Sequence, residues 1–241
     1  GIGNKNIKII FNKYSLGAGH ARNLGLEVAE GKWLLFADAD DYYLNIDALF
    51  NKYSEVENVD IVYFNCKGES DKTNRCVKYN KIVKEYFLNS SIGDKRIRFN
   101  WWTPWNKMVK KSLVDTYNLR FEEVMSGNDA KFCLLAGYFA DKIAVELDCY
   151  YISTIQQNSI TLRKKTLDER IEQLKVMMKI WNFTVLVGAP DAEYKNNIIS
   201  IPVIRGLLYD YGIKGVLLYV KQYFKAVSYT HLRAHETAAN L

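Results

Sequence analysis

The 241-residue chain is poor in proline, cysteine and histidine. Three prolines exclude a proline-rich linker, and the absence of a glycine repeat excludes a collagen-like protein. Four cysteines without a CxxC pair, together with three histidines, argue against a structural zinc site. They fit a reduced cytosolic protein better than a disulfide scaffold. Hydrophobic residues make up 49% of the chain, which excludes a disordered protein.

The chain also lacks a strong charge of one sign. Its 33 Lys and Arg residues against 27 Asp and Glu residues give a net charge of +6. This excess suits an anionic ligand or a membrane surface, and it is too weak to indicate nucleic acid. A proline and several charged residues interrupt the long apolar stretch Ile198 to Val220, whereas a spanning helix needs ~20 mostly apolar residues. We therefore expect packed helices there, with a face lying in the membrane interface as the alternative.

Both ends of the chain are unusual. The chain starts Gly1-Ile2-Gly3 rather than with methionine, and no basic-then-apolar signal peptide follows, so we expect a fragment or a processed form. Residues 228–241 carry two of the three histidines and show no sustained periodicity. We expect this segment to be a non-native tail without function.

Apolar runs alternate with amphipathic segments up to about residue 152. This order is typical of an α/β domain with a mostly parallel sheet flanked by helices. The predicted strands are Ile7–Asn12, Lys32–Ala37, Val59–Asn65, Arg75–Tyr79 and Lys142–Ile152. The predicted helices are Ala21–Glu30, Asn45–Val56, Lys81–Asn89, Lys107–Tyr117 and Asp129–Phe139.

The C-terminal part of the chain is predicted to be helical. Amphipathic patterns cover Leu167–Val187, Glu193–Tyr211 and Lys214–Val227. We place a boundary near Thr161 to Lys165, which separates an α/β catalytic domain, residues 1–161, from a helical region, residues 162–227.

An acidic cluster, Asp38-Ala39-Asp40-Asp41, follows the apolar run Lys32–Ala37. Ligands of open α/β sheets bind outside the carboxyl ends of strands. Three carboxylates so close together repel one another unless a cation or a hydrogen-bond donor neutralises them. Oxygen ligands of this kind suit Mg²⁺ or Mn²⁺ shared with substrate phosphates. The alternative is a solvated acidic turn that caps the helix predicted at Asn45–Val56.

The surroundings of this cluster add a more specific pattern. Residues 17–41 contain a glycine turn, Ala21-Arg22-Asn23-Leu24-Gly25, an Ala29-Glu30-Gly31, an apolar strand and then the acidic cluster. This order resembles the family 2 glycosyltransferases of the GT-A fold. A weaker likeness continues through Pro104-Trp105-Asn106-Lys107 and Gly127-Asn128-Asp129, so the resemblance spans Ile7 to Thr161. The nearest members in character are bacterial enzymes that build cell-surface polysaccharides.

The resemblance implies a donor site for a nucleoside diphosphate sugar, most often UDP-linked. Its metal, Mn²⁺ or Mg²⁺, would be held by Asp40 with Asp38, and Asp41 is either a third ligand or a helix cap. The donor-binding residues are then Arg22, Asn23, Asp38, Trp105 and Lys107. Four of them have a simpler alternative: Arg22 in a local ion pair, Asn23 holding the turn, Trp105 in the core and Lys107 in solvent.

The family's reaction inverts the anomeric carbon and needs a base for the acceptor hydroxyl. In the family pattern this base is the Asp of an acidic pair that opens a helix, which here is Asp129. Asn128 stands where the pattern has Glu. A carboxylate that simply caps the helix is the alternative. The acceptor would be a glycan or a lipid-linked sugar, and the protein would lie in the cytoplasm or at the inner face of the cell membrane.

Two alternatives concern the whole protein. Family members begin with a βαβ unit that binds the nucleotide base, and too few residues precede Ile7 to form one. We therefore expect residues 1–241 alone to be inactive or poorly folded. A degenerate domain that binds or scaffolds, and a nucleotidyltransferase that makes sugar nucleotides, are the alternative functions.

Overall fold

The computed structural model of the chain describes residues 7–69, 74–154, 163–189 and 198–238. The chain divides into two compact units, Gly1–Ile160 and Thr161–Leu241. Each unit is described by itself below. The sequence analysis assigned a catalytic role to residues 1–161, and that role stays a prediction.

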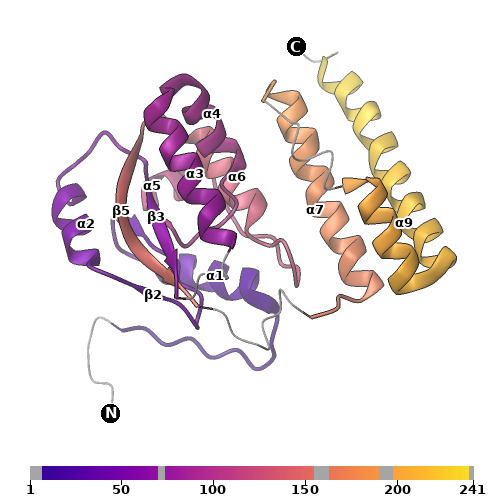
Figure 1. Cartoon of the computed structure of the whole chain (residues 1–241), viewed down its shortest axis with the longest axis horizontal. Helices are drawn as coiled ribbons and strands as arrows, with labels where there is room; N and C mark the ends of the chain where they lie inside the picture. The colour runs from indigo at the N-terminus through magenta and orange to yellow at the C-terminus, as the bar shows by residue number, and fades with distance from the viewer. Residues whose placement is uncertain (1–6, 70–73, 155–162, 190–197, 239–241) are drawn as a thin grey trace. The chain divides into compact units, whose positions relative to one another are not determined.

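The first unit contains a five-stranded sheet with the order β1-β4-β3-β5-β2. The strands are β1 (Trp33–Leu34), β2 (Tyr42–Tyr43), β3 (Ile61–Gly68), β4 (Lys107–Lys110) and β5 (Ile143–Ser153). Figure 1 shows α3, α4 and α6 on one side of β3 and β5, with α2 on the other side. Since Ile61 to Phe64 are all fully buried and β3 lies between β4 and β5, this strand forms the centre of the core.

The direction of the strands corrects one prediction. Among the described strands, β3 and β5 pair in parallel, whereas β1–β4, β3–β4 and β2–β5 are antiparallel. The expectation of a mostly parallel sheet is therefore wrong. The cause is the connection between β3 and β4, which contains two helices, α3 (Asn74–Leu88) and α4 (Ser90–Asn100). Helix α3 carries the chain back from the end of β3, and helix α4 carries it forward again to the same end of the sheet. Strand β4 therefore starts at that end and runs antiparallel to β3.

Three local predictions also fail. Residues 7–12 form no strand; their apolar side chains, such as Phe11 at 89% exposure, find no neighbouring strand among the described residues. Arg75–Tyr79 lies in helix α3 rather than in an edge strand. The helix predicted at Lys107–Tyr117 is instead β4 followed by α5 (Lys111–Thr116), because β4 is paired on both sides and sheet pairing overrides local propensity.

The other helices of this unit lie close to their predicted positions. They are α1 (Gly17–Val28), α2 (Ile46–Tyr53) and α6 (Ala130–Phe139). Helix α1 begins four residues before the prediction, at Gly17, whose φ of 88° suits a glycine. The four cysteines are free thiols.

The second unit consists of α7 (Leu167–Leu186) and α9 (Ile201–Ala238), which contact each other. Thr166 and Glu169 form a capping box at the start of α7. Helix α9 is kinked at Gly212, which lies between the two helices predicted at Glu193–Tyr211 and Lys214–Val227. Residues 193–197 of the first of these lie outside the described residues. The α9 backbone remains helical through Ala238, within the segment expected to be a non-native tail.

No helix in the described parts of the chain is long and apolar enough to cross a membrane. The stretch Ile198 to Val220 instead packs within the second unit. Ile198, Leu207 and Tyr219 are buried there, and the Tyr219 hydroxyl donates to the carbonyl of Ile198 at 2.9 Å. Part of this stretch therefore packs as predicted, while Ile213 and Leu217 remain exposed.

Candidate functional site

The Arg22 guanidinium joins three segments that are far apart in the sequence. From α1, it donates one hydrogen bond to Oδ1 of Asp38 at 2.7 Å, in the turn between β1 and β2. It donates a second to Oδ1 of Asn128 at 2.8 Å, in the loop before α6. The Arg22 side chain is only 15% exposed, so this charged contact is partly shielded from solvent. The segments carrying the acidic cluster and Gly127-Asn128-Asp129 therefore meet at one point.

Asn23 fastens the same loop to α1. Its side-chain NH₂ donates to the carbonyl of Phe121 at 3.0 Å, and its side-chain oxygen accepts from the Phe121 N–H at 2.9 Å. The Asn23 side chain is 8% exposed, and both of its polar groups are therefore used to hold backbone. This placement corresponds to the alternative named for Asn23, in which its side chain holds the turn. Asn23 therefore supports the site through the backbone of the loop.

The acidic cluster forms a tight turn closed by the Asp41 N–H, which donates to the carbonyl of Asp38 at 3.0 Å. Both carboxylate oxygens of Asp41 are engaged: Oδ2 accepts from the Tyr151 hydroxyl at 2.6 Å, and Oδ1 accepts from the Thr154 N–H at 2.7 Å. Burial raises the pKa of Asp41, although these two hydrogen bonds oppose the shift. Asp41 therefore ties the turn to the end of β5.

The three carboxylates of the turn do not converge on one point. In the described ranges, no group of three or more His, Cys, Asp or Glu side chains is arranged to hold a metal ion. Asp41 has no free oxygen, Asp38 accepts from Arg22 through one oxygen, and the Asp40 side chain is exposed. Asp41 therefore has fewer open acceptor positions than Asp38 or Asp40, because each of its oxygens already uses one lone pair on a hydrogen-bond donor.

Asp129 lies at the N-cap of α6 but does not cap it. Its side chain makes no capping hydrogen bond. Burial raises the pKa of Asp129, while the positive charges of Arg22 and Lys107 lower it and the negative charge of Asp38 raises it further. Since these charges act on one carboxyl group, Asp129 belongs to the same electrostatic cluster as the Asp38 turn. A carboxyl group held in this way has the raised pKa that suits a general base.

Lys107 and Trp105 lie in the core beneath the cluster. Lys107 is fully buried, and its Nζ donates to the carbonyl of Trp101 at 3.1 Å. Burial lowers the pKa of Lys107, and the nearby Cys133 and Asp129 oppose the shift. Trp105 is 1% exposed and stacks on the ring of Tyr151, with centroids 4.7 Å apart. The structure thus places Lys107 away from solvent and Trp105 in the core.

Two residues of the site were missed by the sequence analysis. Tyr151 accepts from the Asp38 N–H at 3.2 Å and donates to Asp41, and Thr154 donates from its hydroxyl to the carbonyl of Asp40 at 2.7 Å. Both lie more than 100 positions from the turn, and nothing in their local sequence signals the contact. Their position at the carboxyl end of a predicted strand was the only signal that could have found them.

Tyr151→Phe tests whether this hydroxyl holds the acidic turn. We expect unfolding free energy to fall by about 1–3 kcal/mol, because the variant leaves a half-buried carboxylate without one of its donors. Tyr150→Phe is the matched control on the same strand, since its hydroxyl makes only a 3.4 Å contact with Asp148. Urea unfolding of both variants measures the difference, and equal midpoints would show that the turn does not need Tyr151.

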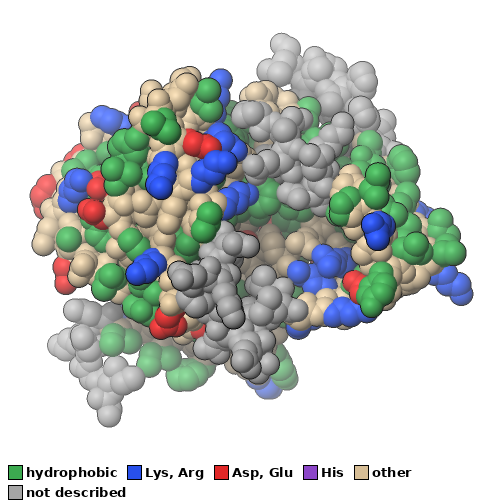
Figure 2. Space-filling view, viewed as in Figure 1, with side chains coloured by type: hydrophobic (Ala, Val, Ile, Leu, Met, Phe, Trp, Pro, Cys, Tyr) green, Lys and Arg blue, Asp and Glu red, His purple; other side chains and the backbone are tan. Residues whose placement is uncertain are grey.

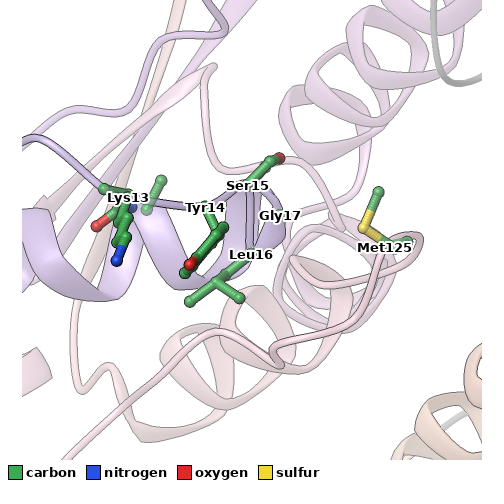
Figure 3. A pocket seen from close by; sticks show the side chains of 9 residues that line it. Lys13, Tyr14, Ser15, Leu16, Gly17 and Met125 are labelled. Carbon is green, nitrogen blue, oxygen red and sulfur yellow. The ribbon is translucent and has the colours of Figure 1, made fainter.

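A pocket of about 460 Å³ opens at the start of α1. Figure 3 shows Lys13 and Tyr14 on one side of Gly17 and Met125 on the other. Met125 belongs to the same loop as Asn128, and its Sδ lies 3.5 Å from where a Cβ on Gly17 would stand. The pocket and the Arg22 cluster therefore share α1 and this loop. The residues that line the pocket are Asn12, Lys13, Tyr14, Ser15, Leu16, Gly17, Ala18, Ala21 and Met125.

The fold and this site define an α/β protein of the GT-A type, and comparison with solved structures agrees. The structure of S. aureus TarS 1-349 in complex with UDP-GlcNAc superposes with a TM-score of 0.60 at 22% identity. The match covers 89% of this chain and 61% of that chain. The α/β GT-A fold predicted from the sequence is thereby confirmed, apart from the strand directions corrected above.

Sequence comparisons show similarity to one family of enzymes. Residues 2–115 match the model of glycosyl transferase family 2. Two Bacillus subtilis (strain 168) proteins named as glycosyltransferases are similar: EpsH, 24% identical over 64% of this chain, and EpsJ, 26% identical over 72%. The chain covers 46% of EpsH and 53% of EpsJ, so it spans about half the length of these relatives. The match to the model of glycosyl transferase family 2 agrees with the resemblance that residues 17–41 predicted.

Proposed function

We propose that the protein transfers a sugar from a nucleoside diphosphate sugar, UDP-linked, to a glycan or a lipid-linked acceptor on the cytoplasmic side of the membrane. The observation that carries the proposal is the Arg22 bridge, which brings the Asp38 turn and the Asn128-Asp129 loop together. The match of residues 2–115 to the model of glycosyl transferase family 2 supports the reaction class. S. aureus TarS, which shares the fold, was solved with UDP-GlcNAc, and this supports a UDP-linked donor.

Asp129 is proposed to act as the general base. As the acceptor oxygen attacks the anomeric carbon, its O–H proton passes to the Asp129 carboxylate and the bond from the anomeric carbon to the diphosphate breaks. Attack opposite to the leaving diphosphate inverts the anomeric carbon. The absence of a capping hydrogen bond leaves the Asp129 carboxylate available for this proton, and its burial favours accepting it.

Asp40 and Asp38 are proposed to hold a divalent cation, Mn²⁺ or Mg²⁺. The second oxygen of Asp38 and the exposed carboxylate of Asp40 provide oxygen ligands, and such ions are commonly bound by one or two carboxylates together with substrate phosphates. Asp41 is assigned to holding the turn rather than the ion, because each of its oxygens already accepts one hydrogen bond. When bound, the cation would neutralise charge that develops on the departing diphosphate.

The remaining predicted donor residues are assigned supporting roles. Arg22 keeps a positive charge beside Asp38 at the edge where the diphosphate would lie. Asn23 holds the loop that carries Asn128, Trp105 supports Tyr151, and buried Lys107 lies under Asp129. For Trp105 and Lys107 the role follows from burial, because a side chain with almost no exposed surface cannot contact a donor without rearrangement.

The variant Asp40→Asn tests whether Asp40 binds the cation and whether turnover of the donor depends on that cation. We expect metal-dependent release of UDP from a UDP-sugar to fall by roughly 10²-fold or more, because one anionic ligand of the cation is lost. Asp47→Asn is the matched control, because Asp47 is also exposed and lies on the neighbouring helix α2. Calorimetric titration of UDP with and without Mn²⁺ adds a readout besides activity.

Two outcomes would contradict this assignment. UDP binding that is indifferent to Mn²⁺ in the unsubstituted chain would exclude the metal. Equal losses in Asp40→Asn and Asp47→Asn would exclude the specific role of Asp40. Metal-dependent UDP binding without any sugar transfer would instead favour a domain that binds rather than catalyses.

A further inference from the structure

The second half of helix α9 has an exposed face that combines apolar and basic side chains. The apolar members are Ile213 at 69% exposure, Leu217 at 64% and Phe224 at 59%. Figure 2 shows hydrophobic and basic side chains next to each other in this part of the molecule. We call this surface the α9 face; its exposed basic members are Lys214, Lys221 and Lys225.

The helical period places these residues in two adjacent stripes. At ~100° per residue, the three apolar side chains fall within about 40° of one another, and the three lysines fall within the next ~80°. The buried residues of the same helix, Gly215 and Tyr219, point the opposite way. A Cβ on Gly215 would stand 3.7 Å from the Leu167 side chain of α7, so the α9 face points away from α7.

The charge of the α9 face is of one sign. Residues 213–227 contain three lysines and no Asp or Glu. The nearest acidic residue along the helix, Asp210, is already paired with Lys164 at 3.0 Å. A row of lysines beside exposed Ile, Leu and Phe is the pattern of a helix that lies in a membrane interface, with its apolar side chains in the lipid and its lysines at the headgroups.

We propose that the α9 face binds the surface of an anionic lipid bilayer. The occupant follows from charge complementarity, because the lysines need an anionic surface and the apolar stripe needs an apolar layer directly beneath it. A second copy of this chain fits less well: a symmetric contact through this face would bring lysines against lysines. The binding is peripheral, since α9 is not apolar enough to span a membrane. The inference does not depend on sugar transfer.

Vesicle binding by the whole chain tests the proposal. We expect the chain to sediment with vesicles of phosphatidylcholine and phosphatidylglycerol and not with vesicles of phosphatidylcholine alone. The variant Lys214→Gln/Lys221→Gln/Lys225→Gln should bind the anionic vesicles roughly 100-fold more weakly, given the attraction of each lysine to such a surface. Added salt should weaken binding of the unsubstituted chain, because it screens exposed charges.

A second triple variant separates this face from net charge. Lys81→Gln/Lys84→Gln/Lys95→Gln removes the same charge from exposed positions of α3 and α4, and it should bind like the unsubstituted chain. Leu217→Ser/Phe224→Ser should also lose binding while keeping all three lysines. Equal losses in the two lysine triples, no vesicle binding at all, or dimerisation through this face measured by ultracentrifugation would overturn the proposal.

Discussion

Asp129→Asn is expected to slow sugar transfer by about 10²–10⁴-fold, because the amide cannot accept the proton of the acceptor hydroxyl. Affinity for UDP should change little, since the substitution keeps the shape of the side chain and leaves the acidic turn intact. Asp115→Asn, on helix α5 and paired with Lys111 at the surface, is the matched control and should keep full activity. Initial rates with saturating donor, together with a UDP titration, measure both quantities.

The raised pKa of Asp129 adds a dependence on pH with a defined sign. The carboxyl group is active only when ionised, so transfer should fall as the pH decreases through its raised pKa, above the range of an ordinary Asp. In the folded state the group binds its proton more tightly than in the unfolded chain. Stability therefore decreases as the pH rises from the unfolded to the folded pKa.

The stability of the same variant gives a second readout. Asp129→Asn has no charge to bury at neutral pH, so it should unfold at the same or a higher urea concentration than the unsubstituted chain. A variant that is inactive and also much less stable would indicate a structural role for Asp129. A variant that keeps its activity would remove Asp129 from the mechanism.

Gly19→Ala is expected to separate helix α1 from the loop that carries Asn128. A Cβ at this position would stand 2.1 Å from the carbonyl oxygen of Glu122 and 3.0 Å from the Cβ of Asn128. Backbone at this distance cannot move aside cheaply, so we expect a loss of about 1–3 kcal/mol in unfolding free energy. Because the same shift would stretch the Arg22–Asn128 hydrogen bond, sugar transfer should fall as well.

Gly25→Ala is the control on the same helix. Nothing lies within 4 Å of a Cβ at Gly25, so the added methyl group meets open space. Alanine in a helix interior is then favoured over glycine by roughly 0.5–1 kcal/mol. Urea unfolding should therefore move in opposite directions for the two variants. A shift of the same sign in both would show that the close approach at Gly19 is not limiting.

The parts of the fold that could be predicted are those with a strong local signal. The apolar run of β3, the helix α6 and the kink of α9 at Gly212 follow from patterns within a few neighbouring residues. The paired state of β4 could not be predicted, because Lys107–Lys110 has no alternation of its own and becomes a strand through contacts with β1 and β3. The direction of β4 depends on α4, which the sequence analysis did not find.

The site also contains residues that could be predicted and residues that could not. The acidic cluster could be recognised because its carboxylates are adjacent in the sequence, and Arg22, Asn128 and Asp129 could be named through the family pattern. The partners of the turn could not, since Tyr151 is 110 positions from Asp41. The burial of Lys107 could not be predicted either. Lysine is usually a surface residue, whereas Lys107 lies in the core.

The connection between β3 and β4, which contains α3 and α4, determines which residues of β4 lie beside the carboxyl end of β3. Because the strand is reversed, its first residue, Lys107, aligns with Tyr63, while Val109 aligns with Ile61 at the start of β3. The antiparallel direction of β4 therefore places the buried ammonium group of Lys107 over the Tyr63 ring, 5.1 Å from its centroid.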